Sequence, residues 1–202
     1  MSFSKSGSFS EALKEKHLDV WNACYHHPFV QELGAGTLDK ECFKFYLVQD
    51  YKYLIEYARV FALGALKADT ELLMTRFTQS QHAILKFEMD LHREYMRKFE
   101  IDTEEAKAVR SSLFNKAYTA NMLAVAQRGG AAEILAVIFP CAWSYRDFAL
   151  RLASDYPDKL NDNNYKSWIE TYSSQEYLDS FTWFFDELDR LAESRLPDER
   201  AY

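Results

Sequence analysis

Glycine and proline are scarce in this sequence: six glycines and four prolines are spread over 202 residues. Because these two residue types end helices and form tight turns, their scarcity leaves room for long elements. No stretch shows sustained alternation of apolar and polar residues, whereas apolar residues recur at spacings of three and four in several long segments. The pattern argues against a sheet protein and predicts an all-α bundle of about seven helices.

Cysteine is also rare, and its three positions are Cys24, Cys42 and Cys141. An odd number at irregular spacing suits neither a disulfide framework nor a zinc site. We therefore expect three free thiols.

The sequence has no long apolar run and no excess of positive charge. No window approaches the roughly 18 apolar residues that span a bilayer, and the N-terminal segment lacks the apolar stretch of a signal peptide. We therefore expect a cytoplasmic protein. With 24 Lys and Arg against 31 Asp and Glu, the formal net charge is -7. Such a chain has no basic field to attract phosphate groups, so neither nucleic acid nor an anionic membrane is expected as a partner.

Apolar and aromatic residues, by contrast, are abundant. They make up 48% and 16% of the chain, which excludes disorder. The length suits one substantial core, so we predict a single helical domain over residues 1–202.

Capping residues and helix breakers divide this domain into elements. The predicted helices cover residues 8–25, about thirty residues from Thr37 or Asp39, residues 70–99, a short segment after Asp102, a segment from Ser111 or Ser112 to Arg128, one from Ala131 onward, residues 165–172 and residues 174–195. The paired Gly129 and Gly130 predict a left-handed helix exit. Pro140 predicts a kink in the helix that begins at Ala131, because it lacks the N–H that would bond Ala136.

Cys141 directly follows this proline and is a candidate nucleophile. A helix irregularity releases a backbone carbonyl and can aim side chains into a cavity. Tyr145 lies four residues further on, so the phenol and the thiol share a helix face. The alternative is that Cys141 is a small buried apolar residue, the role we expect for Cys24 and Cys42.

Asp50 interrupts an otherwise apolar and aromatic helix face that includes Tyr46, Leu47 and Leu54. A carboxylate on the inward face needs a partner, because an unpaired buried charge costs several kcal/mol or takes up a proton. That partner is either a structural hydrogen-bond network or a ligand, and the sequence leaves both open.

Four of the thirteen tyrosines lie in mostly apolar surroundings and predict a pocket fringed by phenols: Tyr53, Tyr118, Tyr145 and Tyr172. The alternative is that they are half-buried core residues.

Histidines raise the question of a metal or a haem. A ferritin-like di-iron bundle needs paired Glu-x-x-His steps, whereas Glu88 and His92 are four residues apart and have no second copy. We predict no metal site. A haem-binding protein with His17, His26 or His27 as the axial ligand remains a further alternative.

Several segments together resemble the TenA/thiaminase II family. They are His27-Pro28-Phe29-Val30, Phe45-Tyr46-Leu47-Val48-Gln49-Asp50 followed by Tyr53, Glu88-Met89-Asp90-Leu91-His92-Arg93-Glu94, Ala132-Glu133-Ile134-Leu135 leading into Pro140-Cys141-Ala142-Trp143-Ser144-Tyr145, and Trp168-Ile169-Glu170-Thr171-Tyr172. Their order and approximate spacing match the family over essentially the whole chain.

The resemblance implies a haem-oxygenase-like all-α fold and a homotetramer. It implies that Cys141 is the nucleophile, that Asp50 binds the amino-pyrimidine edge of the substrate, and that the four tyrosines surround it. The implied activity is hydrolysis of a C–N bond in an aminopyrimidine, or in thiamin itself, in thiamin salvage and without a cofactor. The alternative is a non-catalytic or regulatory protein that binds a pyrimidine-like ligand.

The sequence departs from the family pattern at its end. Family members continue into another helix with a Glu that pairs with the cysteine and protonates the ring, whereas this sequence stops at Arg200-Ala201-Tyr202. We expect the chain to lack that helix through truncation, because Leu196-Pro197-Asp198-Glu199-Arg200 has the composition of a connector. The other possibility is that this protein binds its ligand without efficient turnover.

Overall fold

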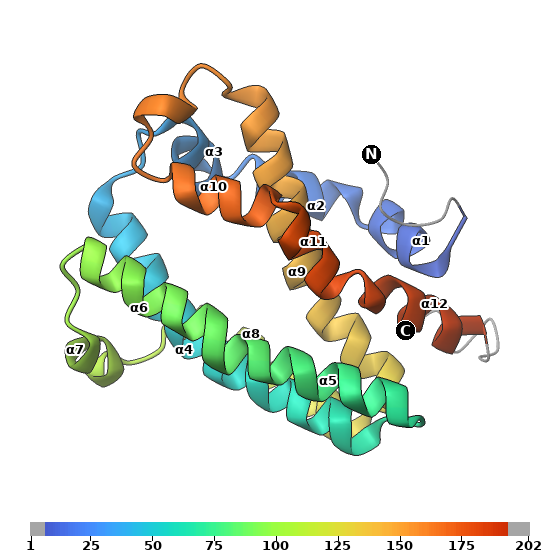
Figure 1. Cartoon of the computed structure of the whole chain (residues 1–202). Helices are drawn as coiled ribbons and strands as arrows, with labels where there is room; N and C mark the ends of the chain where they lie inside the picture. The colour runs from blue at the N-terminus through green and yellow to red at the C-terminus, as the bar shows by residue number, and fades with distance from the viewer. Residues whose placement is uncertain (1–6, 194–202) are drawn as a thin grey trace. The chain divides into compact units, whose positions relative to one another are not determined.

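The computed structural model describes residues 7–193, and every regular element within that range is helical (Figure 1). The elements are α1 (Phe9–Lys16), α2 (Leu18–Tyr25), α3 (Pro28–Ala35), α4 (Lys40–Lys67), α5 (Glu71–Ala83), the π-helical turn η1 (Ile84–Glu88), α6 (Met89–Lys98), α7 (Thr103–Ala108), α8 (Leu113–Arg128), α9 (Ala131–Asp155), the 3₁₀ turn η2 (Leu160–Asp162), α10 (Lys166–Ser173), α11 (Gln175–Phe181) and α12 (Trp183–Glu193). The all-α prediction is confirmed. No helix in this range is long and apolar enough to cross a membrane.

The helices belong to two compact units. One contains the chain up to Leu38 and again from Phe139, and the other contains Asp39–Ile138.

The unit of residues 39–138 is built on the 28-residue helix α4. Asp39 caps this helix by accepting a hydrogen bond from the backbone N–H of Glu41 at 2.7 Å. Helices α5 and α8 both pack along α4 (Figure 1). Gly64 permits the close approach of α5, because a Cβ there would lie 2.5 Å from ring atoms of Phe77. Asp50 lies on the face of α4 that meets α6, where its side chain contacts His92.

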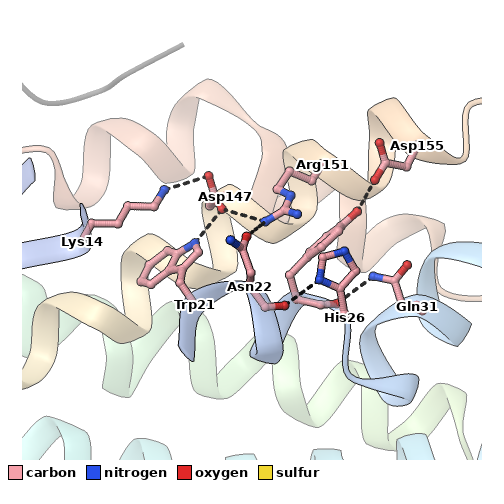
Figure 2. Close-up of polar contacts among 9 residues, drawn as sticks. Lys14, Trp21, Asn22, His26, Gln31, Asp147, Arg151 and Asp155 are labelled. Carbon is pink, nitrogen blue, oxygen red and sulfur yellow. Dashed lines mark hydrogen bonds and ion pairs between the residues drawn. The ribbon is translucent and has the colours of Figure 1, made fainter. Parts of the chain in front are cut away.

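In the other unit, the N-terminal helices are fastened to α9 by side-chain hydrogen bonds. Asp147 on α9 accepts from Lys14 at 3.1 Å and from the indole N–H of Trp21 at 2.8 Å (Figure 2). About two turns further along α9, Asp155 accepts a hydrogen bond from the phenol of Tyr25 at 2.5 Å. Arg151 lies between the two carboxylates, with its guanidinium 3.4 Å from the centre of the Tyr25 ring. These contacts fix the C-terminal half of α9 and therefore the backbone that follows Cys141.

Two of the predicted helices are interrupted in the structure. The segment 8–25 breaks at His17, because α1 packs on α12 through hydrogen bonds from Ser10 to Asp189 while α2 packs on α9. A single straight helix would not follow both partners. The final segment breaks at Thr182, whose hydroxyl bonds back to the carbonyl of Leu178 at 2.7 Å and competes with the helical backbone bond.

Two further local predictions are corrected. Residues 70–99 form a helical run with the π-helical turn η1 inserted between α5 and α6. Gly129 has φ -84° rather than a left-handed conformation, because its N–H still bonds the carbonyl of Val125. Helix α9 continues through Pro140, and the kink expected there stays a prediction. The end of the last helix near Arg195 and the connector from Leu196 lie outside the described residues.

Candidate functional site

Asp50 has a partner on α6. Its Oδ2 atom lies 2.6 Å from Nε2 of His92, and the two side chains are 11% and 3% exposed. The phenol of Tyr46, one turn before Asp50 on α4, donates to the same oxygen at 3.5 Å. The predicted need for a partner is thus met by a second ionisable group.

A third titratable group adjoins this pair. Glu88 ends η1, and its backbone carbonyl lies 2.9 Å from Nδ1 of His92. Burial raises the pKa of the Glu88 carboxyl to about 7; the neighbouring His92 opposes that rise and Asp50 adds to it. Burial also acts against a charged His92, but the Asp50 carboxylate and the Glu88 carbonyl outweigh it, so the pKa of His92 is raised. The π-helical turn immediately before α6 is the kind of irregularity found at functional sites.

A stack of three tyrosine rings lies in the same unit. Tyr53 lies three residues after Asp50 on α4. The centre of its ring is 5.6 Å from that of Tyr118, at an interplanar angle of 10°, and 5.1 Å from that of Tyr57, at an interplanar angle of 25°. The hydroxyl of Tyr57 donates to the backbone carbonyl of Ile138 at 3.0 Å. Tyr53 and Tyr57 are buried while Tyr118 is 44% exposed, so the stack ends in an exposed aromatic face. Such a face suits a flat heteroaromatic ring.

Cys141 lies on α9 in the other unit and is partly exposed. Its backbone carbonyl accepts a hydrogen bond from the hydroxyl of Ser144 at 3.0 Å. The carbonyl of the next residue, Ala142, accepts one from Tyr177 on α11 at 3.3 Å. The backbone on the C-terminal side of the thiol is therefore held by two hydroxyl groups.

An aromatic cluster surrounds the helix face that carries Tyr145. The Tyr145 ring is 4.6 Å from Tyr172 and 5.5 Å from Trp168, and Tyr172 is 4.9 Å from Tyr177. Tyr172 and Trp168 are 8% exposed, while Tyr145 and Tyr177 are half-buried. The structure thus brings together the two predicted tyrosines of this unit, as it brings together Tyr53 and Tyr118 in the other.

Sequence reasoning missed several residues of these groups, among them Tyr57, Glu88, His92, Trp168 and Tyr177. The spacing of Glu88 and His92 does not fit a di-iron motif, and it does not by itself show that His92 contacts Asp50. In residues 7–193 no three His, Cys, Asp or Glu side chains are grouped so as to hold a metal ion. The expectation that Cys24 and Cys42 are small buried residues is wrong, because both are exposed.

Comparison with known proteins identifies the family. Residues 14–201 match the model of the TENA/THI-4/PQQC family. A curated protein of Halalkalibacterium halodurans named aminopyrimidine aminohydrolase is 42% identical over 96% of this chain and 86% of its own length. One of the same name from Helicobacter pylori is 40% identical over 90% of this chain and 83% of its own length.

Solved structures agree with these matches. A crystal structure of a TenA family transcription regulator from a Silicibacter species superposes with a TM-score of 0.88 at 31% identity, covering 96% of this chain and 85% of that one. A TenA homologue from P. horikoshii superposes with a TM-score of 0.85 at 30% identity, covering 96% of this chain and 89% of that one. The resemblance to TenA proteins and the fold that it implied are confirmed, and the chain belongs to the TENA/THI-4/PQQC family.

Proposed function

We propose that this protein is an aminopyrimidine aminohydrolase of thiamin salvage, which releases ammonia from an aminomethyl-substituted aminopyrimidine. The relatives that carry this name are 40% and 42% identical to it over nearly the whole chain. The observation that carries the proposal is the His92-paired carboxylate of Asp50, one turn from the stacked ring of Tyr53. A carboxylate beside aromatic rings matches the two demands of an aminopyrimidine, an acceptor for its amine and a flat apolar surface for its ring.

Cys141 is the nucleophile in this proposal. Its thiolate adds to a ring carbon of the substrate, the displaced electron pair moves onto a ring nitrogen, and that nitrogen takes up a proton. The C–N bond to the aminomethyl nitrogen then breaks and ammonia leaves with a proton. Water adds to the resulting methylene carbon and loses a proton. The C–S bond then breaks as the ring nitrogen releases its proton, which restores the thiolate and the aromatic ring. Partial exposure of Cys141 gives the thiol the access that this step requires.

Asp50 accepts hydrogen bonds from the exocyclic amine and fixes the orientation of the ring. Orientation of this kind contributes several kcal/mol toward a barrier when the reacting groups are held rigidly. The contact with His92 holds the Asp50 side chain, so that this carboxylate does not have to be ordered when the substrate binds.

The tyrosines have two roles in the proposal. Tyr53 and Tyr118 present a stacked face to the substrate ring, and Tyr145 and Tyr172 provide phenol groups near the helix face of Cys141. Phenol groups bind water and stabilise developing charge. The proposed reaction needs no metal and no organic cofactor.

Ammonia release from 4-amino-5-aminomethyl-2-methylpyrimidine tests the proposal, with thiamin assayed in parallel. Multiple turnovers on the aminomethylpyrimidine support it, and faster turnover of thiamin would move the assignment to thiamin hydrolysis. Absence of turnover on both substrates, with the protein folded, would overturn it.

A ligand-binding role without catalysis is a second candidate, because one solved relative at 31% identity is described as a transcription regulator. Calorimetry with the corresponding hydroxymethylpyrimidine distinguishes the two. Tight binding by a folded protein that shows no turnover supports the regulatory role, whereas binding together with turnover supports the enzyme.

We also propose a cytoplasmic homotetramer, on the strength of the family resemblance. Light scattering coupled to size-exclusion chromatography tests the assembly. A mass near four times 23.7 kDa supports the tetramer, and a monomer mass would contradict it.

A further inference from the structure

Two consecutive residues of α4 fasten this helix to two different neighbours. Asp50 contacts His92 on α6, whereas the buried side chain of Gln49 contacts the start of α8 and the loop before it. Its Oε1 atom accepts a hydrogen bond from the backbone N–H of Ser112 at 2.8 Å, and its Nε2 atom donates one to the carbonyl of Arg110 at 3.3 Å. One turn of α4 therefore holds both α6 and α8.

Asn115 on α8 bonds to Gln49 in return. Its side-chain amide donates to the backbone carbonyl of Gln49 at 2.6 Å and lies 3.4 Å from Oε1 of the same residue. In an α-helix the carbonyl of residue 49 also accepts the N–H of residue 53, four positions further on. Asn115 thus bonds to the carbonyl that holds the backbone of Tyr53. Gln49 and Asn115 together are called the amide clasp below.

The stacked rings of Tyr53 and Tyr118 lie about one turn beyond the amide clasp on both helices. Tyr53 follows Gln49 on α4, and Tyr118 follows Asn115 on α8. The two rings are within 10° of parallel, although Tyr118 is 44% exposed. An exposed ring keeps one orientation only where its own helix is fixed, because a rotation of α8 by one residue position, about 100°, would turn the ring away from Tyr53.

The far end of α8 is fastened to α4 by a separate contact. Lys67, in the last turn of α4, donates to the carbonyl of Gln127 at 2.6 Å and to that of Gly129 at 2.5 Å. This contact lies about four turns beyond Tyr53 along α4. The amide clasp adjoins the stack, and the Lys67 contact does not.

We infer that Gln49 and Asn115 are positioning residues, which hold the Tyr118 ring parallel to Tyr53 and so form the aromatic face for the pyrimidine ring before the substrate binds. The inference rests on the proposed function and adds two residues that act through the tyrosine rings. A face that is already ordered improves affinity, because ordering a side chain on binding has a free-energy cost. Since Asp50 belongs to the same turn of α4 as Gln49, the acceptor for the amine and the face for the ring keep a fixed relation.

Asn115→Asp tests the inference in the full chain. The substitution keeps the size of the side chain but turns a carboxylate oxygen toward the Gln49 carbonyl, while a negative charge in the first turn suits α8 itself. We expect the dissociation constant of the hydroxymethylpyrimidine, measured by calorimetry, to rise about three- to tenfold. With saturating aminomethylpyrimidine, kcat should stay within about twofold of the wild-type value, because a binding contribution is lost. An unchanged dissociation constant would overturn the inference.

Lys67→Met is the matched control, because it removes two hydrogen bonds between the same two helices at a distance from the stack. It should lower the melting temperature and leave the dissociation constant near that of the wild type. Equal rises of the dissociation constant in Lys67→Met and Asn115→Asp would show that loosening of α8 alone accounts for the effect, and would contradict the inference.

A fluorine label on the Tyr118 ring gives a readout apart from binding and turnover. With 3-fluorotyrosine at position 118, the ring current of Tyr53 shifts the ¹⁹F signal, and Tyr53→Leu defines the signal without that shift. Asn115→Asp should move the signal toward the Tyr53→Leu position, and Lys67→Met should leave it at the wild-type position. A signal that Asn115→Asp does not move would overturn the inference.

Gln49→Met keeps the inference testable where Asn115→Asp fails to fold. Methionine has a similar volume and removes the bonds to Ser112 and Arg110, while the backbone carbonyl at position 49 still accepts from Asn115. The fluorine signal should move in the same direction by a smaller amount, and no movement would overturn the inference. A signal that responds to these substitutions in a protein that releases no ammonia would support the role of the amide clasp and contradict the proposed function.

Discussion

The phenol of Tyr177 on α11 donates a hydrogen bond to the backbone carbonyl of Ala142, the residue that follows Cys141, at 3.3 Å. Pro140 has no N–H, so one backbone bond of α9 is already missing just before the thiol. Tyr177 therefore stabilises the backbone on the opposite side of Cys141 from that gap. It also joins this backbone to the aromatic cluster through its contact with Tyr172.

Tyr177→Phe keeps the ring packing and removes this hydrogen bond. We expect a loss of about 0.5–1.5 kcal/mol in the free energy of unfolding and a several-fold lower kcat, because the thiol is less well fixed. Tyr156→Phe is the matched control: it removes a 3.0 Å bond to Gln31 in the same unit, remote in sequence from Cys141. Urea unfolding and ammonia release are measured on both. Equal effects of the two substitutions on kcat would contradict a special role for Tyr177.

Asp50→Asn preserves the shape of the side chain but replaces one acceptor oxygen by a donor. Binding and turnover should weaken together, since the substrate's amine then faces a donor. The decisive comparison uses an analogue of the pyrimidine without the exocyclic amine. The wild type should prefer the amine-bearing ligand strongly and Asp50→Asn much less. The same preference in both proteins would show that Asp50 is structural.

Glu88 predicts a pH dependence of stability. Its pKa rises from 4.5 to about 7 on folding, so the folded state holds the proton more tightly than the unfolded chain. The stabilisation from this proton is complete below pH 4.5, declines as the pH rises and is lost above about pH 7. Glu88→Gln mimics the protonated form and does not titrate. The unfolding free energy of Glu88→Gln, relative to that of the wild type, should therefore be higher at pH 8 than at pH 5.

Urea titrations at these two pH values measure the difference. Glu94→Gln is the control, because Glu94 is exposed on α6. This substitution should change the unfolding free energy by the same amount at pH 5 and at pH 8. If the unfolding free energies of Glu88→Gln and the wild type differ by the same amount at pH 5 and pH 8, the raised pKa of Glu88 is contradicted.

Much of the fold was predictable because its signals are local. Asp39, Thr70, Asp102, Ser112 and Ser174 each cap a helix as their side chains indicate, and the long helix α4 follows from its three-and-four spacing. The break at His17 was not predictable. It depends on hydrogen bonds from Ser10 to Asp189 and from Trp21 to Asp147, which join residues more than a hundred positions apart.

The candidate site divides in the same way. The inward position of Asp50 follows from the apolar residues around it, and the shared face of Cys141 and Tyr145 follows from helical spacing. The identity of Asp50's partner does not follow from local spacing, because His92 reaches Asp50 from another helix. The Glu88–His92 spacing places the Glu88 backbone carbonyl against Nδ1 of His92, but it does not show that Nε2 meets Asp50.

The central claim is that Cys141 forms a covalent bond to the substrate, and ammonia release by Cys141→Ser tests it most directly. The alcohol is far less ionised than a thiol, so turnover should fall to background while the helical spectrum and the melting temperature stay near those of the wild type. Cys24→Ser and Cys42→Ser, which change exposed thiols, should retain full activity. Release of ammonia at the wild-type rate by folded Cys141→Ser would contradict the account.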